Sequence, residues 1–428
     1  MIDAYRGIAP DSVLSELSIL AEALQGRTLQ HVNSTRTGGG VAELLTRLVP
    51  LTTSLGIPTT WDVIMGSPSF FEVTKAMHNA LQGADIEIPH TDRQLYLRTL
   101  QENAEHLHLD ADVVIIHDPQ PAYLIDYCPV ERQRLVWRCH IDLSRPNEQV
   151  WRFLCRAVSK YAMAVFHVPQ FAQRLPIPQI IIPPSIDPLS AKNRELTEEE
   201  ITAVTDRFGI DRQRPILVQV SRFDRFKDPL GVIAAYRMVR QNFDCQLVLA
   251  GGDASDDPEG KQVLEEVQEA AAGDPDIFVL SLPPDSDIEI NALQRAATVV
   301  LQKSTREGFG LTVTEAMWKG KPVIGGAVGG IPSQIIHGVT GFLVHSIEGA
   351  AFRLRYLLSH PRRAQRMGEQ GREYVRRNFL ITRHLRDYLL LMLTILHHCP
   401  KGPIRLSTSF PASQNTGSAD RTCDLTSG

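Results

Sequence analysis

The chain of 428 residues lacks the sequence features that several classes of protein require. It has no run of eighteen apolar residues, so no transmembrane helix is expected, and residues 1–10 lack the basic and apolar regions of a signal peptide. It also has no excess of basic side chains, because its net charge is −5. These absences argue against a nucleic-acid-binding protein and against stable membrane association, and they favour a cytoplasmic protein.

Cysteine is scarce, and its spacing excludes a further class of site. The six cysteines are scattered with no C-x-x-C pair, which favours free thiols over a disulfide framework or a zinc site. His106 and His108 have no partner ligands at a metal-binding spacing, and neither have His397 and His398. We therefore predict no protein-bound metal ion and no tightly bound cofactor.

What the chain does contain is an alternation of short apolar runs with helix-like stretches. The runs 113–117 and 216–220 have the continuous apolar pattern of buried parallel strands. Alternation of this kind implies βαβ units, and we interpret the proline-ended run 179–188 as a linker. The sequence predicts an α/β fold with two doubly wound, Rossmann-like domains, at residues 1–183 and 189–375.

The most informative motif is the stretch EGFGLTVTE at 307–315, in which two carboxylates flank a glycine turn. A helix that begins near Gly310 would present free backbone N–H groups, which suit a phosphate or another anion. Glu307 would precede this helix, and Glu315 would lie about one and a half turns into it. One carboxylate could then reach a sugar while the other reaches ribose hydroxyls. The alternative is an ordinary loop with two solvated acids.

A basic loop follows the apolar run 216–220. Arg222 and Lys227 would project from it at the carboxyl end of the predicted strand, where open α/β sheets bind ligands. Two cations at this place can neutralise a diphosphate leaving group, the guanidinium as a fork and the ammonium as a point charge. The alternative is a solvated loop, because the segment is charged throughout.

Two glycine-rich turns complete the set of motifs. Gly38, Gly39 and Gly40 lie between a predicted strand and a predicted helix, where backbone N–H groups could approach a phosphate closely. Gly329 and Gly330 follow another predicted strand and could line a donor sugar. Either turn could equally be an ordinary connection between a strand and a helix, without a role in ligand binding.

Taken together, these motifs resemble those of a known enzyme family. The two glutamates match the E-x7-E signature of retaining glycosyltransferases of family 4, which have the GT-B fold. Blocks of the first half resemble the trehalose synthase and trehalose phosphorylase group: HVNST at 31–35, GGGVAE at 38–43, FFEVTK at 70–75, HNALQG at 78–83, HDPQP at 117–121 and WRCHIDLS at 137–144. The resemblance implies two domains that face a cleft, with a helix at about 376–398 returning to the first domain. The polar tail 401–428 is expected to be disordered.

The resemblance also implies roles on the donor side. Arg222 and Lys227 would hold the leaving diphosphate. Glu315 would bind the ribose, and Glu307 the donor hydroxyls. His140 would bond the 6-hydroxyl of the donor sugar, although a satisfied histidine at a strand end is the alternative. The further donor-binding candidates are Gly39, Gly40, Gly308, Phe309, Gly310, Leu311 and Thr312.

On the acceptor side the resemblance implies a smaller group of polar residues. The candidates are Lys75, His78, Asn79, Asp118, Gln120 and Asp142. His78 and Asn79 could equally be exposed helix residues. The activity implied is transfer of glucose, with retention, from UDP-glucose or ADP-glucose to glucose, which makes trehalose reversibly. A magnesium ion could accompany the nucleotide without protein ligands, and the resemblance leaves a homodimer open.

Four other functions compete with this one. A trehalose phosphorylase would need the same cationic pair for inorganic phosphate, and a family-4 transferase could use another acceptor. A lipid-modifying transferase needs a basic amphipathic face, but the stretch 41–49 carries Arg47 as its one cation. A sugar-binding regulator with a dead site is disfavoured, because the expected charged positions are all occupied.

Overall fold

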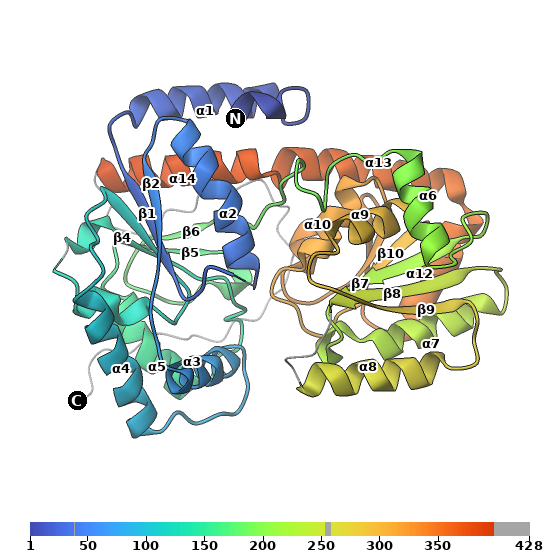
Figure 1. Ribbon diagram of the computed structural model, residues 1–428, viewed down its shortest axis with the longest axis horizontal. Coiled ribbons are helices and arrows are strands. Elements are labelled where there is room, and N and C mark those ends of the chain that lie inside the picture. Colours follow the sequence, from blue (N-terminus) through green and yellow to red (C-terminus); the bar gives the residue numbers. More distant parts are fainter. Residues whose placement is uncertain (38, 130, 253–257, 398–428) are drawn as a thin grey trace. The chain divides into compact units, whose positions relative to one another are not determined.

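The computed structural model describes residues 1–37, 39–129, 131–252 and 258–397. It divides into two compact units, one made of Met1–Pro184 with the C-terminal part from Ile381 onward, and the other of Ser185–Leu380. Each unit contains one six-stranded sheet in which all neighbouring strands pair in parallel (Figure 1). The predicted α/β class with two doubly wound sheets is therefore confirmed.

The first sheet has the strand order β2-β1-β3-β4-β5-β6. Its strands are β1 (Leu29–Asn33), β2 (Thr59–Val63), β3 (Val113–His117), β4 (Leu135–Arg138), β5 (Met163–Phe166) and β6 (Gln179–Ile181). Its helices are α1 (Asp11–Ala23), α2 (Gly39–Ser54), α3 (Pro68–Leu81), α4 (His90–Ala104), α5 (Glu148–Val158) and α14 (Ile381–Leu396). The helix α14 packs against α1, α2 and β3, while α3 packs against α4 and α5 on the other side of the sheet (Figure 1). Because helices cover both faces, every residue of β3 is buried.

The second sheet has the order β12-β11-β10-β7-β8-β9. Its strands are β7 (Ile216–Val220), β8 (Gln246–Gly252), β9 (Ile277–Leu282), β10 (Val299–Gln302), β11 (Val323–Gly326) and β12 (Gly341–Val344). Its helices are α6 (Glu198–Arg207), α7 (Pro229–Arg240), α8 (Pro258–Ala271), α9 (Asp287–Ala296), α10 (Leu311–Trp318), α11 (Ile331–Gln334), α12 (Ile347–Ser359) and α13 (Pro361–Asn378). The helix α7 packs against both α8 and α12, whose apolar residues form one core with the sheet.

The C-terminal helix differs from its prediction. The sequence suggested one helix over about 376–398, but α13 ends at Asn378 and α14 begins at Ile381. Between them the carbonyl of Phe379 accepts a hydrogen bond from the Ile186 N–H at 2.9 Å, and Leu380 forms a parallel bridge with Ile186. Phe379 has φ −131° and ψ 12°, which are not helical, and Leu380 pairs with a distant segment, so the two residues end one helix before the next begins.

The cysteine prediction holds in part. Cys128, Cys139 and Cys245 are free thiols, as predicted. Cys155 is disulfide-bonded, so the prediction of a free thiol is wrong for it. Cys399, Cys423 and the tail predicted to be disordered lie outside the described residues. Within the part of the chain that the structure describes, no helix is long and apolar enough to cross a membrane, and no three His, Cys, Asp or Glu side chains gather as metal ligands.

Candidate functional site

A buried ion pair joins the basic loop to the first glutamate of the E-x7-E motif. The ammonium Nζ of Lys227 lies 2.7 Å from Oε2 of Glu307, and the two side chains are 17% and 8% exposed. The same oxygen accepts hydrogen bonds from Ser304 Oγ at 3.1 Å and Gln302 Nε2 at 3.4 Å. Because β7 and β10 are neighbours in a parallel sheet, their carboxyl ends bring together a cation and a carboxylate that are 80 residues apart in the chain.

The loop that carries Glu307 is held by the glycine turn after β11. Gly330 donates its N–H to the carbonyl of Gly308 at 3.0 Å. Gly329 has a left-handed φ of 54°, and a Cβ at this position would overlap the carbonyl oxygen of Glu307. The sequence left open whether this turn lines a donor sugar or only connects two elements. In the structure it supports the backbone of the Glu307 loop, and only glycine fits that closely.

The helix of the motif begins at the predicted place. Gly310 caps α10 in the left-handed region, with φ of 82°, and Leu311 is the first helical residue. Thr312 donates its hydroxyl to Gln302 Oε1 at 3.1 Å, and the Phe309 carbonyl accepts a hydrogen bond from the Gln334 amide. Phe309 is buried, so its ring serves packing, and what it can offer a ligand is its backbone.

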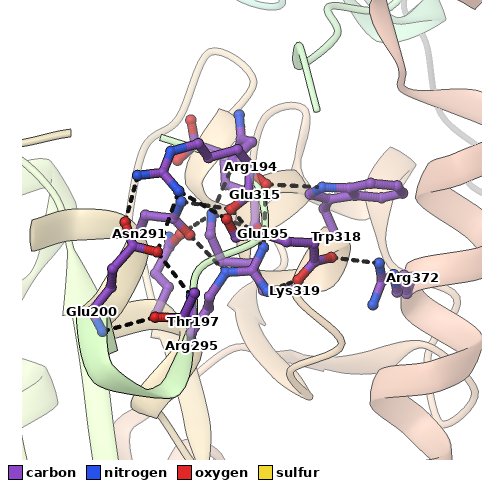
Figure 2. A network of polar contacts seen from close by, with 12 residues as sticks. Arg194, Glu195, Thr197, Glu200, Asn291, Arg295, Glu315, Trp318, Lys319 and Arg372 are labelled. Carbon is purple, nitrogen blue, oxygen red and sulfur yellow. Dashed lines mark hydrogen bonds and ion pairs between the residues drawn. The ribbon is translucent and has the colours of Figure 1, made fainter. Parts of the chain in front are cut away.

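The second glutamate of the motif lies in a polar network inside the second unit (Figure 2). Glu315 is 4% exposed, and its carbonyl accepts a hydrogen bond from the ammonium of Lys319 at 3.3 Å. That ammonium also donates to Gln294 Oε1 at 2.8 Å and Asn193 Oδ1 at 3.0 Å. Burial lowers the pKa of Lys319, while the charge of Glu315 acts in the opposite direction.

Arg222 is placed differently from its predicted partner Lys227. Its side chain is 77% exposed, and its guanidinium lies 3.6 Å from Asp224. An exposed pair of this kind contributes little to stability, because water screens it. The structure does not bring the guanidinium to Glu307.

In the first unit, Asp118 and the backbone of His140 are brought together. Asp118 follows β3 with a left-handed φ of 67°, and its Oδ1 accepts a hydrogen bond from the His140 N–H at 2.6 Å. Its carbonyl accepts from Trp137 Nε1 at 3.0 Å. Burial raises the pKa of Asp118 to about 7, against the opposing effects of the His140 N–H and the charge of Arg138.

The ring of His140 is hydrogen-bonded on both sides. Its Nε2 lies 2.8 Å from Nδ1 of His117, and its Nδ1 lies 3.1 Å from Nε2 of His167. Burial lowers the pKa of His140 well below its usual range, and the charge of Arg138 adds to the effect. Both ring nitrogens of His140 therefore have histidine partners in the structure, and its contact with a donor sugar stays a prediction.

The hydrogen bonds among the described residues do not join the other predicted residues of the first unit into one cluster. Asp142 accepts a hydrogen bond from the Ser144 N–H at 2.8 Å, which closes a turn. His78 lies on α3 and its ring pairs with Gln82 at 3.1 Å, and burial lowers its pKa. Gln120 is half-buried. The remaining candidates are the exposed Lys75 and Asn79, and Gly39 and Gly40 in the first turn of α2.

Sequence reasoning missed two groups of residues. Gln302 and Ser304 anchor Glu307, and their only signal was their place at the end of a predicted strand. The histidines that flank His140 were quoted as parts of motifs but not connected to one another. A signal did exist, because four predicted strands each carry a histidine at or near the carboxyl end.

Both halves of the chain match families of known proteins. Residues 31–173 match the family described as "Trehalose synthase, N-terminal domain", and residues 201–374 match "Glycosyl transferases group 1". The chain is 48% identical to a trehalose synthase of Pyrococcus horikoshii over 398 residues, which are 91% of this chain and 95% of that protein. The chain belongs to the trehalose synthase family. As a member of this family it is a glycosyltransferase concerned with trehalose.

Two more distant proteins are also similar to this chain, one in sequence and one in structure. A trehalose phosphorylase of Pleurotus pulmonarius is 28% identical over 80% of this chain and 54% of its own length. The structure of an alpha,alpha-trehalose-phosphate synthase (UDP-forming) from Burkholderia xenovorans matches with a TM-score of 0.69 and 14% identity, over 86% of this chain and all of that one. At this identity the match concerns the fold alone, and it confirms the predicted GT-B fold of this trehalose synthase family member.

Proposed function

We propose that this protein transfers glucose, with retention, from UDP-glucose or ADP-glucose to a second glucose, and so forms trehalose with an α,α-1,1 linkage. The observation that carries the proposal is the ion pair between Lys227 and Glu307 just before the N-terminus of α10. A fixed ammonium beside a carboxylate, next to a helix N-terminus, suits a ligand that has both a diphosphate and a sugar.

On the donor side each group has a separate task. Lys227 would stabilise the charge that develops on the diphosphate as the glycosidic bond breaks, with Arg222 turning in from the surface. Glu307, whose Oε2 is already held by three donors, would orient the donor hydroxyls. Glu315 would bind the ribose. The backbone N–H groups at residues 308–312 would supply further donors to the ligand.

A same-face displacement accounts best for retention. The bond from the anomeric carbon to the diphosphate breaks, and a bond from the same carbon to the hydroxyl of glucose forms on the same face. The proton of that hydroxyl passes to the departing phosphate oxygen. Glu307 is engaged with Lys227, Ser304 and Gln302, which disfavours it as a covalent nucleophile. Catalysis would then consist of positioning and charge stabilisation.

The first unit would supply the acceptor side. The Asp118 turn and the main chain of His140 are fixed by their mutual hydrogen bond, so they offer a rigid surface to a sugar. The six acceptor candidates named from the sequence remain candidates. The protein would need no tightly bound cofactor, and a magnesium ion that accompanies the nucleotide would need no protein ligand.

A phosphorylase is the second candidate function. It is favoured by the likeness to the Pleurotus pulmonarius trehalose phosphorylase, of which the chain spans about half the length. Lys227 and Arg222 would then neutralise inorganic phosphate in place of a nucleotide diphosphate.

A donor screen tests the proposal against this alternative. Purified protein is mixed with glucose and, separately, with UDP-glucose, ADP-glucose, GDP-glucose or α-glucose 1-phosphate, and the disaccharide is identified. Trehalose formed from a nucleotide sugar supports the proposal, and trehalose formed only from glucose 1-phosphate makes the protein a phosphorylase. Lys227→Ala should abolish the product, whereas Lys261→Ala, an exposed lysine of α8, should not. No disaccharide from any donor would refute the acceptor assignment.

A further inference from the structure

Four neighbouring strands of the first sheet each place one histidine in a single row. His31 lies in the middle of β1, His117 ends β3, His140 comes two residues after β4 and His167 one residue after β5. These strands are consecutive in the sheet, in the order β1-β3-β4-β5. Because all are parallel, their carboxyl ends meet at the same edge, where His117, His140 and His167 lie, and His31 joins them from the middle of β1.

The four rings form one continuous hydrogen-bonded chain. Nδ1 of His31 lies 2.9 Å from Nε2 of His117, Nδ1 of His117 lies 2.8 Å from Nε2 of His140, and Nδ1 of His140 lies 3.1 Å from Nε2 of His167. Every link therefore joins an Nδ1 to an Nε2 in the same direction. His31, His117 and His167 are at most 4% exposed, so water cannot replace these partners.

This geometry restricts where the protons lie. A neutral imidazole has one N–H and one lone pair, while an imidazolium has two N–H groups and no acceptor. An imidazolium inside the row would donate to both neighbours and force opposite tautomers on its two sides, whereas in an all-neutral row each inner ring accepts on one nitrogen and donates on the other. Since the links all run in one direction, the four rings must share one tautomer, either all Nδ1–H or all Nε2–H. Burial and the charge of Arg138 lower the pKa of His117, His140 and His167, which keeps these rings neutral.

We propose that His31, His117 and His167 are positioning residues, which hold His140 and its hydrogen-bonded Asp118 turn in place through one proton-ordered imidazole chain. The proposal rests on the proposed function, in which Asp118 and His140 form the sugar-facing edge of the first unit. It assigns a role to three residues that are not among the candidate donor-binding or acceptor-binding residues.

Two observations show what the chain would hold. Asp118 has a left-handed φ of 67°, which is unfavourable for a residue other than glycine and needs support from its surroundings. That support comes through the His140 N–H, 2.6 Å from Asp118 Oδ1, and through Trp137. The imidazole row fixes the ring of His140, and Asp118 fixes its backbone. His140 then presents a rigid surface to a sugar and does not act as an acid or base.

The first test reads the tautomers directly and needs no substrate. Nitrogen-15 NMR of imidazole-labelled protein near neutral pH should show four neutral histidines with one shared tautomer. The four are assigned by their loss in single His→Asn variants. A mixture of tautomers among four neutral rings would overturn the chain, and an imidazolium signal from His117 or His140 would overturn its neutral, single-direction proton order. Because no turnover is measured, this result is independent of the proposed function.

The second test separates positioning from mere packing. His31→Leu removes the end link, whereas His31→Asn keeps a polar group near the position of Nδ1. We expect His31→Leu to lower kcat for disaccharide formation about tenfold, with little change in KM, and to shift the nitrogen signals of His140. His31→Asn should restore kcat to within about twofold even if both variants lose equal thermal stability. His106→Leu, at an exposed histidine, is the control.

These outcomes can be told apart. An unchanged kcat and unchanged His140 signals in His31→Leu would refute the positioning role. If the wild type forms no disaccharide, the proposed function fails, while the tautomer measurement still decides whether the chain exists.

Discussion

At the scale of single residues, the ion pair between Lys227 and Glu307 is where sequence and structure agree most closely. The two residues belong to separate motifs, and the sequence predicts Lys227 at the carboxyl end of a strand and Glu307 just before a helix. The structure adds the anchors Ser304 and Gln302. These could not be inferred, because a serine or glutamine at a strand end has no spacing that marks it as a partner of a carboxylate.

Neutralising Glu307 should weaken catalysis strongly. Glu307→Gln keeps the shape of the side chain but removes the charge beside Lys227, which is 17% exposed and would lose its ion-pair partner. We expect kcat/KM to fall by roughly 10²–10³ and the free energy of unfolding by about 1–3 kcal/mol. Steady-state kinetics and urea unfolding check these values. The exposed Glu265→Gln is the control, and near wild-type kcat/KM in Glu307→Gln would contradict the assignment.

Two buried lysines close together in the chain should respond differently to replacement. The ammonium of Lys319 has three oxygen acceptors (Figure 2). The ammonium of Lys321 has no hydrogen-bond or ion-pair partner among the described residues, and burial lowers its pKa to about 8. Lys319→Met leaves the oxygens of Asn193 and Gln294 without their donor.

We therefore expect Lys319→Met to lower the free energy of unfolding by about 2–3 kcal/mol. Lys321→Met removes only a charge that burial disfavours, so its effect should be neutral or slightly stabilising. Urea unfolding of both variants measures the difference. Equal effects would mean that the Lys319 network contributes nothing beyond the burial of its side chain.

At the scale of elements, the glycine turn after β11 determines the shape of the Glu307 loop. A methyl group at Gly329 would overlap the Glu307 carbonyl and would also require an unfavourable φ. Gly338 has a similar left-handed φ of 79° but open space around its Cβ position. Substitutions at Gly329 and Gly338 therefore separate two contributions to the free energy of unfolding: the unfavourable backbone conformation and the close approach to Glu307.

Gly329→Ala should consequently impair the enzyme more than Gly338→Ala. We expect the strain at Gly338 alone to cost about 1–2 kcal/mol of unfolding free energy with kcat nearly unchanged. Gly329→Ala should cost more and lower kcat at least about tenfold, because it displaces the loop of Glu307. Thermal unfolding and disaccharide assays check both. A Gly329→Ala enzyme with normal kcat would show that the turn does not support the site.

The elements that could be predicted are those with an apolar pattern of their own. The strands β3 and β7 have the predicted bounds, because continuous burial imposes a continuous apolar run. The four-residue strand β12 is too short to show a period. The helix α6 had a usable signal that was overlooked, since Thr197 and Glu200 form a capping box.

Contacts that depend on strand order lay beyond the sequence. The histidine row exists because β1, β3, β4 and β5 are neighbours, and a sequence does not state which strands are adjacent. The break between α13 and α14 likewise depends on Ile186, which lies almost two hundred residues earlier in the chain. Local propensity favours one uninterrupted helix there, and a tertiary pairing overrides it.

At the scale of the whole molecule, buried histidines should make stability depend on pH. Burial is the chief cause that lowers the pKa values of five histidines, namely His31, His117, His140, His167 and His384. The pKa of His31 falls from 6.5 to about 3. Because the folded pKa lies below the unfolded one, this stability is present above about pH 6.5 and is lost as the pH falls. Asp118 acts in the opposite direction, since its folded pKa is raised to about 7.

The histidines outnumber Asp118, so acidification should destabilise the protein. The buried groups that face them are Arg138, Arg383 with its partner Asp387, and Tyr388. Each histidine should contribute up to roughly 1.4 kcal/mol per pH unit below about pH 6.5. Urea midpoints between about pH 7.5 and pH 5 measure the slope, which should be shallower in His31→Asn. A midpoint independent of pH would contradict the buried neutral state.

The measurement that tests the central claim most directly is the fate of a labelled acceptor. The protein is incubated with the nucleotide-glucose that it uses best and with glucose labelled with carbon-13 at C1, and the product is followed by carbon-13 NMR. We predict that the label appears in an anomeric carbon of a 1,1-linked disaccharide, which proves the trehalose linkage, and that the unlabelled anomeric carbon from the donor is α-configured, which proves retention. Label that stays in free glucose while nucleotide is released, or that enters another linkage, would contradict the account.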